Sequence, residues 1–425
     1  MKTDKLIKNG RIIDPATGRD EITDLFISNG KIAAVPAEIP AAAEIIDASG
    51  KIVCPGFIDV HVHLREPGGE AQETIESGSR ACAKGGFTAI VSMPNTTPVT
   101  DTPEVVKLIK QKGDEAGYIK ILPSASFTKG RAGEELTDLK ALKEAGTVVY
   151  TDDGSTTPET LVMEAAMKEA AALGMKIMDH AQDPHAEKKG CMHEGEYSEK
   201  FNLPGISWMA EYAMVQRDIN LSKMTGCPVH IQHITSGKAI NLIRESQKNG
   251  IKVTCEVTPH HIALCDADID PENANFKMNP PLRSAWDKEQ LIAGVLDGTA
   301  SMFATDHAPH LTEKKALGFE KGPFGIIGAE TAIGVTYTEL VATGKMDLMT
   351  WVKRWTVGPA EFIDMETPSL EPGKAADVVI IDTENDWTVT EEDTVSKGKN
   401  TPFLGQKLKG RAVQTICNGK TTWAE

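Results

Sequence analysis

Residues 57–63 read Phe57-Ile58-Asp59-Val60-His61-Val62-His63, a largely apolar stretch that ends in two histidines separated by one residue. Its β-branched and aromatic side chains predict a buried strand. Successive side chains of a strand point to opposite faces, so His61 and His63 share one face and can grip a single ion. The stretch therefore predicts a strand that carries metal ligands at its C-terminal end.

Further metal-capable side chains follow segments that also read as short buried strands. They lie far apart along the chain, at Asp153, His180, His233 and Asp306. A closed barrel readily brings strand ends with such wide spacing to one point. The pattern therefore indicates a metal-dependent enzyme built on a barrel.

The chain between residues 57 and 345 alternates apolar runs with amphipathic stretches, as βα units do. The strand candidates are 57–61, 89–93, 118–122, 147–151, 175–179, 228–232, 252–258 and 301–305. The helix candidates are 70–84, 102–115, 134–145, 158–173, 206–225, 236–249, 285–296 and 329–342. Eight strands, each followed by a helix, predict an α/β fold with a (β/α)8 TIM-type barrel, whose catalytic groups lie at the C-terminal strand ends.

Both ends of the chain are rich in short apolar pieces broken by Asn-Gly, which is a strong hairpin signal. Neither end alone has enough strands to be stable. We therefore expect residues 1–55 and 361–425 to form one small β-sandwich domain beside a barrel formed by residues 56–360. Within that domain, the polar residues 384–410 read as an extended surface excursion.

The composition limits the classes of partner and compartment. A formal net charge of −16 disfavours nucleic acid and anionic membranes as general partners, although local cations can still bind an anionic substrate. Seven cysteines without a C-x-x-C pair disfavour a disulfide framework and fit a reducing compartment. The N-terminus has no apolar run typical of a signal peptide, and no stretch resembles a membrane span. We expect a cytoplasmic protein.

The candidate ligands are four histidines and two carboxylates, a donor set that suits zinc better than manganese, cobalt or iron. One ion normally takes three or four such ligands. Six therefore predict two ions that share a bridging carboxylate and a bridging hydroxide.

Five motifs together resemble the dihydroorotase family of the amidohydrolase superfamily. The two signature motifs are Pro55-Gly56-Phe57-Ile58-Asp59-Val60-His61-Val62-His63-Leu64-Arg65-Glu66-Pro67-Gly68 and Ala304-Thr305-Asp306-His307-Ala308-Pro309-His310. The others are Ser92-Met93-Pro94-Asn95-Thr96, Met278-Asn279-Pro280-Pro281-Leu282-Arg283 and Pro323-Phe324-Gly325. They occur in family order and span essentially the whole chain.

The resemblance implies a role for each candidate ligand. His61, His63 and Asp306 correspond to ligands of one zinc, and His180 and His233 to ligands of a second. Many related enzymes bridge the ions with a carbamylated lysine, but residues 151–154 read Thr-Asp-Asp-Gly, as in the bacterial branch that uses an aspartate. Asp153 is the implied bridge, and Asp152 is its local competitor, because alternation lets only one of them point inward.

The resemblance also implies the substrate and its contacts. N-carbamoyl-L-aspartate and L-dihydroorotate each carry an α-carboxylate, which suits the planar guanidinium of Arg65. The implied substrate-binding residues are His63, Arg65, Asn95, Asn279, His310, Phe324 and Gly325. Asp306 would act as general base and then as general acid in the reversible ring closure of pyrimidine biosynthesis.

Two alternative functions remain open. Another cyclic amidohydrolase, such as an allantoinase or hydantoinase, would not need Arg65 for simple substrates. A non-catalytic scaffold for aspartate carbamoyltransferase should have lost ligands, and this chain retains all six. A homodimer, or an association with that transcarbamoylase, is compatible with the resemblance.

Several residues have a plainer interpretation. Arg65 could form a structural ion pair with Glu66 or Glu70. Residues 311–323, with Gly318 and Gly322, could form an ordinary solvated loop, and their functional interpretation is a lid that closes over the substrate. His185 and His193 are expected to be exposed. The remaining histidines are interpreted as hydrogen-bonded core residues, at His230, His260, His261 and His307.

Overall fold

The computed structural model describes residues 3–425 and contains a barrel of eight parallel strands. Its strands are β6 (Phe57–Val62), β7 (Phe87–Ser92), β8 (Lys120–Pro123), β9 (Tyr150–Thr151), β10 (Ile177–Asp179), β13 (Val229–Ile231), β14 (Val253–Val257) and β15 (Met302–Phe303). They form sheets of three and five strands, and every pair within these sheets is parallel. Parallel bridges between Ala125 and Tyr150 and between Val62 and His307 join the two sheets. The predicted barrel is confirmed.

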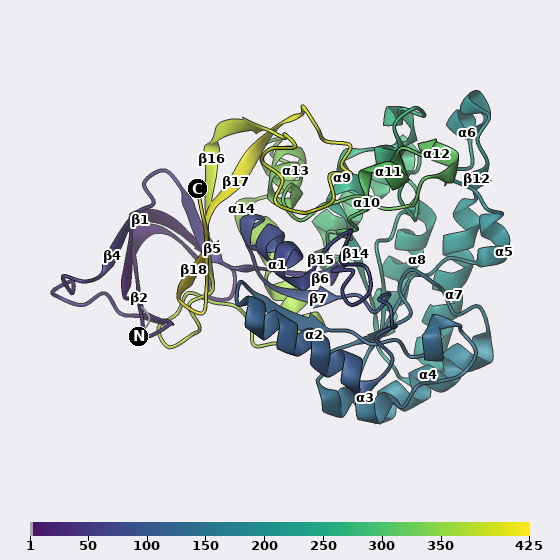
Figure 1. Cartoon of the computed structure of the whole chain (residues 1–425), viewed down its shortest axis with the longest axis horizontal. Coiled ribbons are helices and arrows are strands. Elements are labelled where there is room, and N and C mark those ends of the chain that lie inside the picture. Colours follow the sequence, from purple (N-terminus) through teal and green to yellow (C-terminus); the bar gives the residue numbers. More distant parts are fainter. Residues whose placement is uncertain (1–2) are drawn as a thin grey trace.

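Helices follow the barrel strands and cover their outer side (Figure 1). They are α1 (Ile75–Lys84), α2 (Pro103–Ala116), α3 (Leu139–Ala145), α4 (Thr160–Ala172), α7 (Trp208–Thr225), α8 (Gly237–Lys248), α10 (Ala285–Asp297) and α13 (Ala332–Thr336). Local sequence explains several of their ends. Ser236 and Ser284 accept hydrogen bonds from the first turns of α8 and α10, and Gly226 and Gly298 end α7 and α10 in the left-handed conformation.

Two helices that the sequence interpretation did not include close the floor of the barrel. These are α14 (Leu348–Trp355) and α15 (Val357–Phe362), and α14 contacts both β6 and the first strand of the small sheet. Trp351 packs edge-on against Phe57, and Trp355 stacks on the same ring, with ring centroids 5.4 and 5.8 Å apart. This aromatic cluster fixes the lower end of the strand that carries His61 and His63.

The two ends of the chain join in one eight-stranded sheet beside the barrel (Figure 1). Its strands are β1 (Lys5–Asp14), β2 (Arg19–Ser28), β3 (Lys31–Ala33), β4 (Glu44–Asp47), β5 (Ile52–Pro55), β16 (Val378–Thr388), β17 (Lys407–Cys417) and β18 (Lys420–Ala424). The antiparallel pairing of β5 with β16 connects the N-terminal strands to the C-terminal ones. The small domain thus needs both termini, as the hairpin signals predict.

The polar segment between β16 and β17 differs from the expectation. Residues 389–406 leave the small sheet and lie against the loops of the barrel (Figure 1). Ser396, Asn400 and Phe403 are almost completely buried. The prediction of a surface excursion is therefore wrong for this part, because its polar groups form hydrogen bonds with the barrel instead of with water.

Residues 311–323 form two short helices, α11 (Thr312–Lys315) and α12 (Gly318–Lys321). The buried Lys315 ammonium donates to the carbonyls of Ala274, Lys277 and Pro323 at 2.9–3.1 Å. Closure of this segment over a ligand stays a prediction.

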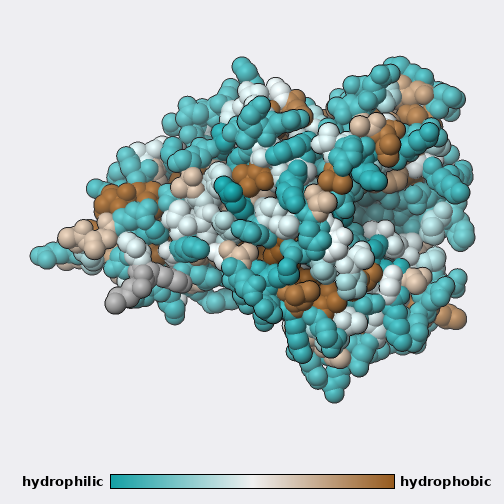
Figure 2. Space-filling view, in the orientation of Figure 1, coloured by the Kyte–Doolittle hydropathy of each residue, from teal (hydrophilic) through white to brown (hydrophobic). Residues whose placement is uncertain are grey.

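The face shown in Figure 2 is mainly hydrophilic, with small apolar patches, as the charged composition predicts. Within residues 3–425, no helix combines the length and the apolar character needed to cross a bilayer.

Candidate metal centre and substrate pocket

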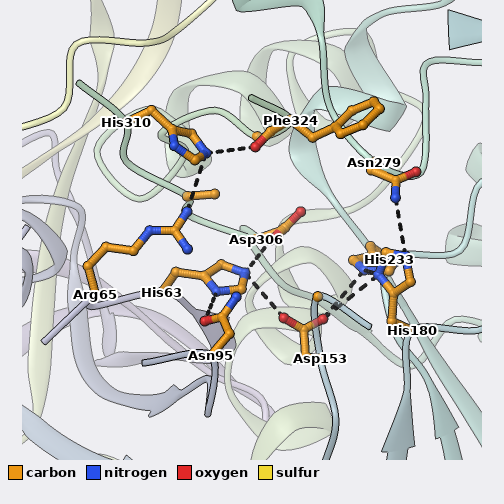
Figure 3. Close-up of a pocket in the computed structure, with 13 residues that line it drawn as sticks. His63, Arg65, Asn95, Asp153, His180, His233, Asn279, Asp306, His310 and Phe324 are labelled. Atoms are coloured by element: carbon orange, nitrogen blue, oxygen red, sulfur yellow. Dashed lines mark hydrogen bonds and ion pairs between the residues drawn. The ribbon is translucent and has the colours of Figure 1, made fainter. Parts of the chain in front are cut away.

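The C-terminal ends of the barrel strands surround a pocket of about 210 Å³. Drug-sized ligands usually occupy pockets of about 300 Å³ or more, so this pocket suits a small metabolite. Most of the predicted site residues line it: His63, Arg65, Asn95, Asp153, His180, His233, Asn279, Asp306, His310, Phe324 and Gly325 (Figure 3). His61 lies beneath this lining and is fully buried.

The Asp153 carboxylate lies among the four histidines. Its Oδ1 is 3.3 Å from His61 Nε2, 3.8 Å from His233 Nε2 and 3.9 Å from His180 Nδ1. Its Oδ2 is 3.4 Å from His63 Nε2. One carboxylate therefore faces every imidazole of the cluster.

Among the described residues, the ion-pair partners of Asp306 are His61, at the end of β6, and His63, which directly follows it. Its Oδ1 is 3.0 Å from His63 Nε2 and 3.4 Å from His61 Nε2. His180 and His233 contact each other on the other side of Asp153, with 2.9 Å between His180 Nδ1 and His233 Nε2. The cluster is thus divided into two groups of donors with Asp153 between them.

Charge makes this cluster suitable for a cation. Burial alone would raise the pKa of Asp153 and Asp306, but the neighbouring histidines lower the pKa of both carboxyls below the ordinary value. Burial disfavours protonation of His61, yet Asp153, Glu256 and Asp306 raise its pKa well above the ordinary value. The ionised carboxylates thus attract either a proton or a metal ion, and a metal ion would displace that proton.

Several buried polar atoms also point to a metal. Among the described residues, His61 Nε2, Asp153 Oδ2 and His233 Nδ1 are buried without a hydrogen-bond partner. Two groups of donor atoms, each within 4.8 Å, can hold an ion: His61 with Asp153 and His233, and His61 with His63 and Asp306. Imidazole and carboxylate donors in this number fit zinc.

Asp152 points away from the pocket. Its carboxylate accepts hydrogen bonds from the hydroxyls of Ser126, Thr128 and Thr157. It therefore ties the loop after β8 to the turn that carries Asp153. Alternation of side chains explains why only Asp153 faces the imidazoles.

Arg65 lies on the opposite wall of the pocket, with its guanidinium directed inward (Figure 3). Its Nε donates to the carbonyl of Pro309 at 3.2 Å, and its Nη2 is 3.4 Å from His310 Nε2. The ion-pair partner of Glu66 among the described residues is Lys112, not Arg65. Burial lowers the pKa of Arg65 to about 10, which leaves the guanidinium charged at neutral pH.

Two neutral groups stand beside Arg65. The Asn95 Oδ1 accepts from His63 Nδ1 at 2.8 Å, so the Asn95 amide N–H groups remain for other partners. His310 Nε2 donates to the carbonyl of Phe324 at 2.7 Å. Burial and the adjacent Arg65 lower the pKa of His310 to about 3, so its ring is neutral at physiological pH. This wall therefore combines one cation, the N–H groups of the Asn95 amide and a neutral imidazole.

The backbone is strained at both walls. Arg65, His233 and Asp306 have positive φ angles of 62°, 30° and 48°. Residues other than glycine rarely adopt this conformation, and such positions concentrate at functional sites.

Comparisons with known proteins agree with this geometry. A model of the family described as "Dihydro-orotase-like" matches residues 50–239. The curated dihydroorotases of Bacillus cytotoxicus and Bacillus anthracis are each 46% identical over 419 residues, which is 98% of this chain and 98% of each relative. The chain belongs to the dihydroorotase family.

Solved structures show how widely this architecture occurs. An L-hydantoinase (dihydropyrimidinase) from Arthrobacter aurescens matches with a TM-score of 0.88 at 23% identity, over 100% of this chain and 96% of that one. A D-hydantoinase matches with a TM-score of 0.85 at 24% identity, over 99% and 95% of the two chains. At such low identity these likenesses concern the fold, in which a barrel and a terminal β-domain occur together.

In this dihydroorotase family member, Glu256 on β14 supports the cluster but is not among the residues predicted from the sequence. The Glu256 Oε1 accepts from His61 Nδ1 at 2.6 Å and from the main-chain N–H of His233 at 3.2 Å. A carboxylate bound to Nδ1 holds the proton there and leaves Nε2 free for a metal. A lone carboxylate within the buried segment Val253–Val257 is the signal that could have revealed it.

One histidine prediction is wrong and another is confirmed. His193 is buried rather than exposed, and its Nδ1 lies 3.3 Å from Arg283 Nη1 in an interior polar network. His185 is exposed, as expected. The histidines interpreted as core residues are all buried: His230, His260, His261 and His307.

Proposed function

We propose that this enzyme interconverts N-carbamoyl-L-aspartate and L-dihydroorotate in pyrimidine biosynthesis, with zinc as its metal. One observation carries the proposal. The cluster of six candidate ligands lies at one small pocket, and the charged Arg65 faces this cluster. The near full-length similarity to curated dihydroorotases supports the same reaction. A simple hydantoin-like substrate has no carboxylate that would require this arginine.

Two zinc ions per subunit would use all six donors. His61, His63 and Asp306 would hold one ion, His180 and His233 the other, and Asp153, which lies between the two groups, would serve both. The position of Asp153 between the two groups of histidines supports this division. Bound zinc supplies a water of lowered pKa and polarises the substrate carbonyl.

Asp306 would move the proton in this reaction. In hydrolysis, the oxygen of water bonds to the ring carbonyl carbon while the carboxylate accepts a proton from that water. The carbon–nitrogen bond then breaks, and Asp306 returns the proton to the leaving ring nitrogen. The neighbouring histidines lower the pKa of Asp306, so its carboxylate is ionised at neutral pH. Ring closure follows the same steps in reverse.

The opposite wall would orient the substrate. Arg65 would form a bidentate pair with the α-carboxylate, assisted by Asn95 and His310, and His63 would also border the bound ligand. Asn279 and the main chain of Phe324 and Gly325 would contact the ring or ureido amide. The unpartnered, buried Oδ1 of Asn279 supports its role as an acceptor.

The alternative of a non-catalytic scaffold predicts that the pocket does no chemistry. The decisive experiment measures dihydroorotate hydrolysis by ultraviolet absorbance and zinc content in the same purified sample. Turnover that rises with zinc content would support the enzyme, and a zinc-loaded sample without turnover would support the scaffold.

Family membership also favours a cytoplasmic enzyme. A homodimer, and an association with aspartate carbamoyltransferase, are further proposals. Size-exclusion chromatography of the protein alone and mixed with that transcarbamoylase would test both.

A further inference from the structure

The segment between β16 and β17, residues 389–406, is here named the C-terminal strap. It starts and ends in the small sheet but contributes buried side chains to the barrel. Asn400 and Thr401 are only 3% and 2% exposed, although both are polar. Buried polar groups need partners, so the partners of Asn400 indicate what the strap does.

Asn400 uses both ends of its amide on the substrate wall of the pocket. Its Nδ2 donates to the carbonyl of Ala308 at 2.9 Å and to the carbonyl of Gly325 at 3.1 Å. Its Oδ1 accepts from the main-chain N–H of His310 at 2.9 Å. The Asn400 side chain thus bridges the turn 308–310 and the turn around Gly325, which are also joined by the main-chain hydrogen bond from Ala308 N–H to Ile326 O at 2.7 Å.

These two turns carry or support every group proposed to contact the α-carboxylate, except Asn95. His310 Nε2 donates to Phe324 O across the gap between the turns. Arg65 Nε donates to the carbonyl of Pro309, between Ala308 and His310. A shift of either turn would therefore displace both the imidazole and the guanidinium.

The strap is fixed independently of Asn400. The Ser396 hydroxyl donates to the Glu73 carboxylate, and the main-chain N–H groups of Val395 and Ser396 donate to Glu330 at 2.9–3.0 Å. Gly398 lies so close to the barrel that an added Cβ would be 2.7 Å from Pro309 Cβ. The strap therefore has anchors that would hold it in place when the Asn400 side chain is changed.

We propose that Asn400 is a positioning residue for substrate recognition, through which the C-terminal strap sets the geometry of the wall opposite the metal ligands. The inference rests on the proposed function for the identity of the ligand. It does not involve the metal ligands, because Asn400 has no hydrogen bond to any of the six.

The test compares Asn400→Ala and Asn400→Asp with Thr401→Ala. Thr401 is an equally buried neighbour, and its hydroxyl accepts from the N–H of Phe403, within the strap. Asn400→Ala removes all three contacts, and Asn400→Asp keeps the acceptor for His310 N–H but turns a carboxylate towards two carbonyls. Each protein is assayed for dihydroorotate hydrolysis, zinc content and thermal unfolding.

We expect the Asn400 variants to bind as much zinc as the wild type while kcat/KM falls by about tenfold to a hundredfold, mainly through KM, because small displacements of positioning groups have effects of this size. Thr401→Ala should remain within about twofold of the wild type. Amide hydrogen exchange at His310 should accelerate in Asn400→Ala without any ligand, because its N–H has lost its acceptor.

Other outcomes would overturn the proposal. These are kcat and KM close to wild type in a folded Asn400→Ala, zinc loss in proportion to activity, an equal effect of Thr401→Ala, or failure of both Asn400 variants to fold. A zinc-loaded wild type that does not hydrolyse dihydroorotate would instead refute the proposed function. The exchange measurement would still test whether Asn400 positions this wall.

Discussion

The two walls of the pocket are built in different ways. The candidate metal ligands come from, or directly follow, the ends of barrel strands, and the buried carboxylate of Glu256 holds the His61 ring. The substrate wall consists of loop residues, and a side chain from the C-terminal strap holds its turns together. Metal binding therefore depends on the rigid strand ends, whereas substrate recognition depends on hydrogen bonds that join distant loops. The two walls meet where Asn95 accepts from His63 Nδ1 and where the Asn279 amide lies 3.4 Å from His180 Nε2, so changes at Arg65, Asn400 and Glu256 separate them best.

Removal of the metal should have the largest effect. Chelation should reduce dihydroorotate hydrolysis to background, because water is activated at neutral pH only on the ions. Added zinc should restore it, and Asp153→Ala should lose zinc together with most activity. Zinc content and rate are measured on the same samples. Full activity in a metal-stripped protein would refute the assignment of this wall.

Asp306→Asn should have the next largest effect. The amide keeps the size of the side chain but cannot accept the proton, so kcat should fall by at least about a hundredfold. Dihydroorotate should still bind, because Arg65 and His310 are unchanged. Steady-state kinetics and zinc analysis test this. Turnover near the wild-type rate, with zinc bound, would transfer the proton role to His307 or His310.

Glu256→Gln tests whether the strand wall depends on its buried carboxylate. Glutamine keeps one acceptor oxygen but loses the negative charge beside His61 Nδ1–H, so zinc binding should weaken by about tenfold to a hundredfold. Competition with a chelator gives this affinity directly. Glu211→Gln is a matched control, because Glu211 is a buried carboxylate that contacts Thr235 and Arg283 but no candidate ligand ring. Equal losses in both variants would indicate a general effect of changing a buried charge.

Arg65→Lys should affect the substrate wall alone. An ammonium cannot form the bidentate pair of a guanidinium, so kcat/KM for dihydroorotate should fall by about tenfold, equivalent to about 1.4 kcal/mol. An analogue without the carboxylate should lose much less, and zinc content should not change. If both compounds lose equally, Arg65 is structural.

The smallest expected effect concerns pH. If His310 had an ordinary pKa, its ring would become charged as the pH falls from about 8 to 5. The charged ring would bind the substrate carboxylate more tightly. Because burial and Arg65 lower the pKa of His310 to about 3, its ring stays neutral in that interval. KM for dihydroorotate should then stay within about twofold, and His310→Asn should show the same flat profile. A drop in wild-type KM towards low pH, absent in His310→Asn, would show that His310 does titrate.

Much of the fold could be predicted from local patterns. The alternation of apolar and amphipathic stretches predicts the barrel strands to within a few residues, because each strand is buried on both faces and each helix on one. Helices α14 and α15 were missed. Their register depends on aromatic packing against Phe57, and a pattern confined to one segment does not show this.

Sequence by itself identified the candidate ligands, because strand alternation and the position at a strand end are local properties that place His61 and His63 on one face. The choice of Asp153 over Asp152 came from the family resemblance. Tertiary structure alone decided which groups support them. Glu256 meets His61 across 195 positions, and Asn400 meets His310 across 90. It also buried His193 and the C-terminal strap, both of which look solvent-exposed in sequence. A polar side chain stays exposed when water is its only hydrogen-bond partner. Here the folded chain supplies the hydrogen-bond partners, so these polar side chains are buried.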